Sequence, residues 1–167
     1  MTNGMPERPP LDVSFRTEEG RFNYRVCGVM LHGDKLLVMR DERSPYYYLP
    51  GGRVQMNEPA EQAVVREIQE ELGVQVAVGR PLWLSQSFFV EDVSQERYHE
   101  LCLYFLIDVS KTDLTERDLF SGVEKRHRHV FQWMPLDRVR EEYLYPTFVK
   151  QRIFQLPEHL ELVTEFE

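Results

Sequence analysis

Runs of apolar residues recur along most of the chain, and their alternation with polar residues predicts β-strands. The runs at residues 22–31 and 35–40 flank the short segment 32–34, which predicts a β-hairpin. Two longer runs, at 82–90 and 98–109, are expected to pair through the acidic stretch between them. Shorter strands are expected at residues 46–49, 74–78 and 127–134.

Between residues 60 and 72 the apolar positions change to a helical period. On a helix they fall on one side: Val64, Val65, Ile68 and Leu72. Pro59 fits the first turn, where a backbone N–H is not needed, and Asn57 or Glu58 is expected to cap that turn. Gly73 is expected to end the helix in a left-handed conformation.

The other segments are less regular. Residues 79–81 are expected to end the strand 74–78, and residues 110–128 are expected to form a long charged loop. Pro135 is expected to open a helix after the last strand. A final helix is expected at 147–155, followed by an acidic tail without a structural prediction.

Three carboxylates, Glu67, Glu70 and Glu71, share a second face of the helix predicted for residues 60–72. Two like charges about 5.5 Å apart repel by roughly 3 kcal/mol at an effective dielectric constant near 20. Arg66 neutralises only one of these charges. A divalent cation such as Mg²⁺ would turn the repulsion into attraction, whereas a solvated acidic face without a ligand is the alternative.

The spacing around these residues resembles the Nudix box, G-x5-E-x7-R-E-U-x-E-E-x-G-U, in which U is aliphatic. The chain has Gly52, then Glu58, and then the run Arg66–Val74 with the sequence REIQEELGV. This resemblance implies an α/β/α sandwich with a central mixed β-sheet. It also implies a Nudix hydrolase that uses Mg²⁺ or Mn²⁺ to cleave a nucleoside diphosphate linked to another moiety, or a nucleoside triphosphate.

The resemblance also assigns roles to the residues of the motif. The carbonyl of Gly52 and the three helix carboxylates are expected to bind the metal: Glu67, Glu70 and Glu71. Either Glu67 or Glu70, or a loop glutamate, is the expected general base, and Arg66 is expected to orient the carboxylates. Glu58 is expected to support Arg66, and Gly73 completes the motif. In parts of the family a later glutamate contributes as well, for which Glu116 and Glu124 are candidates.

Four residues outside the motif are candidates for substrate binding: Tyr47, Arg25, Arg40 and Glu100. In Nudix proteins an aromatic residue commonly precedes the diglycine turn, and Tyr47 has this position. Tyr47 either stacks on a substrate ring or packs against the sheet. The two arginines either contact phosphate or are solvated. Glu100, on a strand with apolar neighbours, either enters the site or lies at the wet end of the strand.

Two histidines and two cysteines each have a structural and a chemical interpretation. His127 and His129 alternate with aromatic residues on the strand predicted for 127–134. They are interpreted as polar side chains at a strand edge, or alternatively as proton donors or phosphate contacts. Cys27 and Cys102 lie in apolar runs and are interpreted as small core residues of a protein in a reducing compartment, although the sequence leaves a disulfide between them open.

The length and composition of the chain limit the number of domains and the kinds of partner that we expect. A chain of 167 residues predicts a single domain, here over residues 15–167, after a flexible arm at 1–14. The net charge of −8 disfavours stable binding to nucleic acid or to an anionic membrane. The chain has neither a signal-peptide pattern nor a long apolar run, so we expect a cytoplasmic protein with a nucleotide-derived small-molecule substrate. A homodimer is possible.

Two alternatives belong to other functional classes. Some Nudix domains bind or sense ligands with weak catalysis or none, but their glutamates are often lost, and here all are present. Nudix-related isomerases need further groups, including a cysteine, that the sequence does not place in an evident site. Nucleoside triphosphates, sugar nucleotides, dinucleoside polyphosphates and ADP-ribose remain open as substrates.

Overall fold

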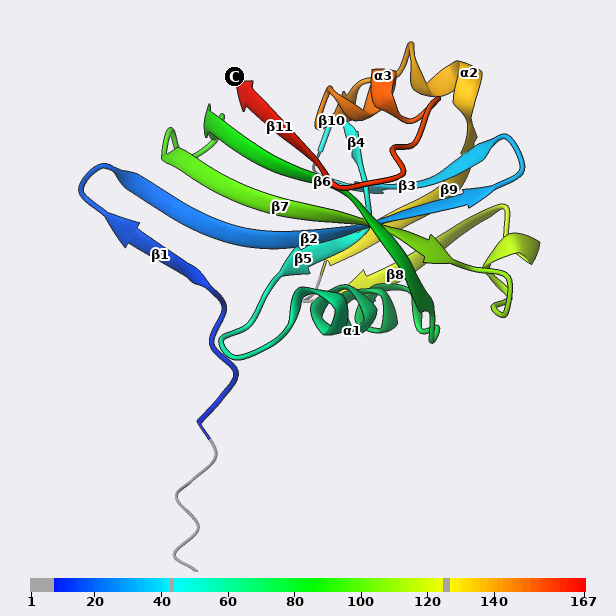
Figure 1. The fold of residues 1–167 in the computed structure, drawn as a ribbon, viewed down its shortest axis with the longest axis horizontal. Coiled ribbons are helices and arrows are strands. Elements are labelled where there is room, and N and C mark those ends of the chain that lie inside the picture. The colour runs from blue at the N-terminus through cyan, green and yellow to red at the C-terminus, as the bar shows by residue number, and fades with distance from the viewer. Residues whose placement is uncertain (1–7, 43, 125–126) are drawn as a thin grey trace, which may run out of the picture.

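The computed structural model describes residues 8–42, 44–124 and 127–167, and it is built around one mixed β-sheet (Figure 1). The strands are β1 (Ser14–Thr17), β2 (Gly20–His32), β3 (Lys35–Asp41), β4 (Tyr47–Tyr48), β5 (Gly51–Arg53), β6 (Ala77–Val90), β7 (Arg97–Asp108), β8 (Leu119–Glu124), β9 (His127–Pro135), β10 (Leu144–Tyr145) and β11 (Glu161–Phe166). The helices are α1 (Ala60–Leu72), α2 (Leu136–Val139) and α3 (Val149–Arg152), with a 3₁₀ turn at Leu114–Glu116.

The main path through the sheet runs β10-β4-β3-β2-β7-β6-β11. The pairs β2–β7, β6–β11 and β4–β10 are parallel, whereas β2–β3, β3–β4, β3–β9 and β6–β7 are antiparallel. Figure 1 shows α1 against one face of the sheet and α2 and α3 against the other. The predicted sandwich with a central mixed sheet is therefore confirmed.

The two faces of the sheet carry separate hydrophobic cores. The α1-side core includes Val26, Met30, Val64, Ile68, Phe105 and Phe131. The α3-side core includes Cys27, Val29, Trp83, Cys102, Phe148 and Val149. Successive residues of β2 contribute to opposite cores, because side chains alternate across a strand. The central part of β2, from Val26 to Met30, is thus buried on both faces. Strands β1, β3, β5 and β7 all pair with β2.

Three predicted segments differ from the structure. Strand β6 begins at Ala77 instead of Val74, and it continues through the segment 79–81 that was expected to end a strand. The register against β7 shifts on both sides of Pro81. A bulge of this kind lets a proline, which has no N–H to donate, remain within a sheet.

The expectation of a long loop at residues 110–128 is also wrong, because β8 lies within this segment and pairs with β9. The helix expected at 147–155 is limited to the short α3. The acidic tail forms β11, a parallel partner of β6 in which Val163 is buried. These strands depend on partners far away in the sequence, so their local composition did not reveal them.

The N-terminal segment is attached to the loop that precedes α1. The N–H of Val13 donates to the carbonyl of Val54 at 2.8 Å, and the N–H of Met56 donates to the carbonyl of Leu11 at 2.7 Å. The flexible arm predicted for residues 1–14 falls partly outside the described residues, which begin at residue 8. No helix in the described ranges is long and apolar enough to cross a membrane.

The position of α1 depends on the contact between Ile68 and the sheet. Ile68 is fully buried, and a Cβ added to Gly28 on β2 would lie only 2.9 Å from its Cδ1 atom. We expect Ile68→Ala to lower the free energy of unfolding by about 2–5 kcal/mol, because it leaves a cavity between helix and sheet. Urea denaturation measures this loss. Val65→Ala, at a half-buried position on the same helix, is the control and should cost less; an equal or larger loss would contradict this account of the packing.

Candidate active site

Helix α1 begins after Pro59 and ends at Gly73, and the backbone conformation differs at these two caps. Pro59 is the N-cap residue, and no side chain caps the first turn, so the expectation that Asn57 or Glu58 caps it is wrong. Asn57 instead adopts a positive φ of 66° in the preceding turn. Gly73 ends the helix with a φ of 70°, as predicted, and its N–H donates to the carbonyl of Gln69 at 2.9 Å.

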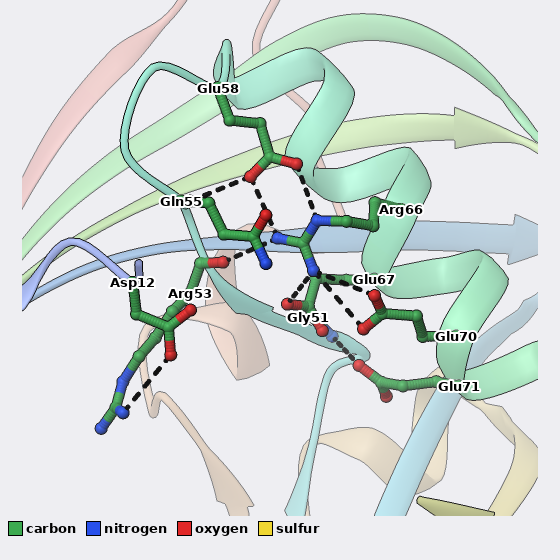
Figure 2. A network of polar contacts seen from close by, with 9 residues as sticks. All are labelled: Asp12, Gly51, Arg53, Gln55, Glu58, Arg66, Glu67, Glu70 and Glu71. Atoms are coloured by element: carbon green, nitrogen blue, oxygen red, sulfur yellow. Dashed lines mark hydrogen bonds and ion pairs between the residues drawn. The ribbon is translucent and has the colours of Figure 1, made fainter. Parts of the chain in front are cut away.

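Glu58 is directed at Arg66 instead of the helix N–H groups, as Figure 2 shows. Nε of Arg66 donates to Oε1 of Glu58 at 2.7 Å, and Nη2 donates to Oε2 at 3.0 Å. Glu58 also accepts the N–H of Gln55 at 2.9 Å. The hydrogen bonds from Arg66 lower the pKa of Glu58 below its ordinary value, and the pKa of Arg66 is raised in turn. The predicted support of Arg66 by Glu58 is present.

The remaining donors of Arg66 connect the loop to the helix carboxylates. Nη2 donates to the carbonyl of Arg53 at 3.0 Å, at the end of β5. Nη1 donates to Oε1 of Glu67 at 2.9 Å and reaches both oxygens of Glu70 at 3.4 Å. The side chain of Glu67 is only 8% exposed, whereas that of Glu70 is 43% exposed. One guanidinium therefore fixes Glu67 firmly and holds Glu70 loosely.

The third carboxylate is fixed by the glycine turn. Oε1 of Glu71 accepts the N–H of Gly51 at 3.1 Å, and Glu71 is buried (Figure 2). A Cβ added to Gly52 would overlap with the carboxylate of Glu67. The lack of a side chain at Gly52 therefore allows the Glu67 carboxylate to lie directly against the turn. Because all these contacts start from α1, the helix and the turn act as one unit.

The oxygen atoms of these residues are of the kind that binds a divalent cation. Among the described residues, no three His, Cys, Asp or Glu side chains already surround a single point. However, Nη1 of Arg66 is shared by oxygens of Glu67 and Glu70, so a positive charge already lies between these carboxylates. Carboxylate and carbonyl oxygens are also the ligands that Mg²⁺ and Mn²⁺ prefer.

The predicted substrate-binding residues form two separate pairs. Arg40 lies over the ring of Tyr47, with 5.4 Å between Cζ and the ring centroid. Tyr47 packs against the α3-side core, away from α1. Glu100 accepts a hydrogen bond from Asn23 at 3.3 Å, and its charge raises the pKa of Arg25 despite the opposing effect of burial.

Tyr48 lies on the side of the sheet that carries the carboxylates, and the sequence analysis did not select it. It packs against the α1-side core, and its hydroxyl is 3.3 Å from Nδ1 of His129. Burial raises the pKa of Tyr48, and the charges of Asp41 and Glu71 raise it further. Because side chains alternate along a strand, the sequence places Tyr47 and Tyr48 on opposite faces of the sheet. Only the pairing of β4 with β3 shows that Tyr48 is the tyrosine on the α1 side.

The other candidates are only partly described. Glu116 is exposed at the end of the 3₁₀ turn. The side chains of Glu124 and His127 lie outside the described part of the structure. Gly122 shows where β8 lies, because a Cβ there would be 3.2 Å from the backbone carbonyl of Glu71. The segment that was expected to be a loop thus packs against the C-terminal half of α1.

The pairing of Glu58 with Arg66 predicts a pH-dependent stability. Because its pKa in the folded protein is lowered, Glu58 stabilises the fold above its ordinary pKa of 4.5, and this contribution is lost as the pH falls through the lowered value. We expect Glu58→Gln to cost about 1–3 kcal/mol near neutral pH and less in acid. Urea denaturation across this pH range measures the difference. Glu158→Gln, at an exposed position, is the control; a Glu58→Gln cost that stayed constant in acid would contradict the assignment.

Comparisons with known proteins agree with this geometry. The family model described as NUDIX domain matches residues 21–153. An ADP-ribose pyrophosphatase from Methanocaldococcus jannaschii is 32% identical over 96 residues, which are 56% of this chain and 54% of that protein. An 8-oxo-dGTP diphosphatase from Proteus vulgaris is 30% identical over 81 residues, which are 47% of this chain and 65% of that protein. The chain thus spans less than two thirds of either relative.

Solved structures show the same fold. The crystal structure of the mutator MutT protein from Bacillus halodurans superposes with a TM-score of 0.61 at 15% sequence identity, covering 86% of this chain and 89% of that chain. The family match extends over most of the chain, and it includes β2 from its second residue, the diglycine turn and all of α1. The chain therefore belongs to the Nudix family.

Proposed function

We propose that the protein hydrolyses a pyrophosphate bond in a nucleoside diphosphate linked to another moiety, or in a nucleoside triphosphate. The observation that carries this proposal is the set of helix carboxylates held against a diglycine turn by Arg66. The names of the two relatives, an ADP-ribose pyrophosphatase and an 8-oxo-dGTP diphosphatase, support the same substrate class.

The residues that would hold Mg²⁺ or Mn²⁺ are Glu67, Glu70, Glu71 and the carbonyl of Gly52. When bound, the metal supplies charge neutralisation at the phosphates and lowers the pKa of a coordinated water. Glu67 and Glu71 are buried and fixed, so they provide oxygens whose positions change little when substrate binds. Such preorganisation reduces the cost of assembling the site for each turnover.

Glu70 is the best candidate for the general base, with Glu67 as the alternative. The base must reach the attacking water, and Glu70 is the most exposed and the least firmly held of the three helix carboxylates. Its contacts to Arg66, at 3.4 Å, are long enough to be given up when it accepts a proton. Arg66 positions the carboxylates and does not itself contact the substrate in this proposal.

The geometry favours neither of the two predicted phosphate contacts. Arg25 lies two residues before Cys27 on β2, so it shares the α3-side face of the strand with that cysteine, away from the helix carboxylates. Arg40 lies on the ring of Tyr47. Tyr48 is an additional candidate for contact with the substrate, because it packs on the α1 side of the sheet, where the carboxylates lie. A cytoplasmic location, a homodimer and a single domain over residues 15–167 remain predictions.

Removing one metal-binding charge tests the proposed activity. We expect Glu70→Gln and Glu71→Gln to lower kcat by about 100-fold or more, since each removes a carboxylate that would hold the metal. Gln at position 71 retains an oxygen for the Gly51 N–H, so the fold should change little. The assay is a panel of nucleoside triphosphates, sugar nucleotides, dinucleoside polyphosphates and ADP-ribose with Mg²⁺ or Mn²⁺, with identification of the products.

The control for these variants is Glu61→Gln, at an exposed position on the same helix, which should leave kcat unchanged. Near-native turnover in either Glu70→Gln or Glu71→Gln would refute the metal assignment. Tight binding of a nucleotide without turnover by the native protein would instead favour a ligand-binding domain.

The glycine turn can be tested by the binding of metal alone. In Gly52→Ala the new methyl group displaces the Glu67 carboxylate, so we expect the affinity for Mn²⁺ to fall by about 10-fold or more. Isothermal titration calorimetry measures this affinity. Gly73→Ala is the matched control: it strains a residue with a φ of 70° but meets no atom within 4 Å. It should lower stability without weakening Mn²⁺ binding, and equal losses of affinity in both variants would argue against the role of Gly52.

A further inference from the structure

Two cysteines on neighbouring strands face each other in the α3-side core. Cys27 lies on β2 and Cys102 on β7, and their sulfur atoms are 3.7 Å apart. In the parallel register, Cys102 is opposite Arg25, and Cys27 is opposite Tyr104. The cysteines are therefore diagonal neighbours whose side chains converge. Both are free thiols, and the hydrolytic site described above uses neither.

The two thiols have different surroundings. Both are buried, but Cys102 is 2% exposed and Cys27 is 7% exposed, so Cys27 is the more accessible residue. A hydrogen bond from Cys102, assisted by the positive charge of Arg25, lowers the pKa of Cys27 despite its burial. Burial raises the pKa of Cys102. Thiolates are the reactive form of cysteine, so Cys27 is the better nucleophile and Cys102 the resolving partner.

Cys27 also contacts the turn on which the carboxylates depend. It is opposite Gly51 in the pairing of β2 with β5. A Cβ added to Gly51 would lie 2.8 Å from Cα and 2.9 Å from Sγ of Cys27. The N–H of Gly51 in turn holds the carboxylate of Glu71. Cys27 therefore lies directly against the glycine turn, with no room between them for a side chain on Gly51.

We propose that Cys27 and Cys102 are a reversible oxidation site, at which a hydroperoxide joins β2 to β7 through a disulfide. The Cys27 sulfur attacks one peroxide oxygen, the O–O bond breaks, and an alcohol or water leaves, which gives a sulfenic acid. The Cys102 sulfur then attacks the Cys27 sulfur, and the hydroxyl leaves with the Cys102 proton as water. Two thiols are oxidised by two electrons, and one hydroperoxide is reduced.

Disulfide formation changes the geometry beside the metal-binding residues. The sulfur atoms must move from 3.7 Å apart to about 2.05 Å. Because Cys27 fills the space under Gly51, this movement displaces the turn and the hydrogen bond to Glu71. Oxidation would therefore lower activity, an effect that rests on the proposed hydrolytic function. The formation of the disulfide does not rest on it.

Mass spectrometry under non-reducing conditions tests the oxidation site in the folded chain of 167 residues treated with hydrogen peroxide. The native protein should lose the mass of two hydrogen atoms, and both thiols should become inaccessible to titration in denaturant until dithiothreitol is added. A peptide joined through Cys27 and Cys102 should appear. In Cys102→Ala, Cys27 should instead gain oxygen. If the native protein gains oxygen or keeps both thiols under conditions that oxidise Cys102→Ala, the proposal is wrong.

The regulatory effect has its own readouts. In the oxidised native protein we expect kcat with the best substrate of the panel to fall by about 10-fold or more, with recovery after reduction. Mn²⁺ affinity should fall in parallel, and the double variant Cys27→Ala/Cys102→Ala should resist peroxide in both assays. A disulfide that forms without either change would overturn the regulatory effect. A protein that forms the disulfide but hydrolyses nothing would overturn the proposed function and leave the oxidation site intact.

Discussion

The guanidinium of Arg66 is the interaction on which the rest of the site depends. It donates to Glu58 and to the carbonyl of Arg53 on the loop, and to Glu67 and Glu70 on the helix. Every nitrogen of the group has a partner, and its positive charge offsets the repulsion among carboxylates that share one helix face. Without it, the loop that follows β5 and the acidic face of α1 would be held together only by weaker contacts.

The glycine turn complements this charge network by allowing close approach. Gly52 makes room for the Glu67 carboxylate, and Gly51 makes room for Cys27 while its N–H holds Glu71. Both glycines pair with β2, the strand that is buried between the two cores. The proposed metal-binding groups therefore lie against a strand whose central residues are buried on both faces. Chemistry that depends on the exact placement of charge benefits from such support.

The same strand gives the two faces of the sheet different chemical characters. On the α1 side, β2 supports carboxylates that suit a hard cation. On the α3 side it carries Cys27, which meets Cys102 of β7 beside the charged residues Arg25 and Glu100. The two faces are separated by a single layer of backbone, and Cys27 lies opposite Gly51 of the glycine turn. The proposed hydrolytic site and the proposed oxidation site therefore share one strand.

Much of the local structure was determined by the sequence alone. The period of Val64, Ile68 and Leu72, with Gly73 after them, predicted α1 almost to the residue. The spacing of Gly52, Glu58, Arg66 and the carboxylates predicted the family and the residues that gather around the turn. These features depend on interactions within a few residues along the chain, so they are visible in the order of residues.

Only the tertiary structure decided the remaining features. Strand β8 forms because it pairs with β9, and β11 forms because it pairs with β6. The bulge at Pro81 occurs because β6 continues through this residue within the sheet. The choice between Tyr47 and Tyr48, and the meeting of Cys27 with Cys102, depend on how β4 and β7 pair. Pairing between distant segments is set by the register of the whole sheet and by the burial of its two faces, and no short stretch of sequence contains that information.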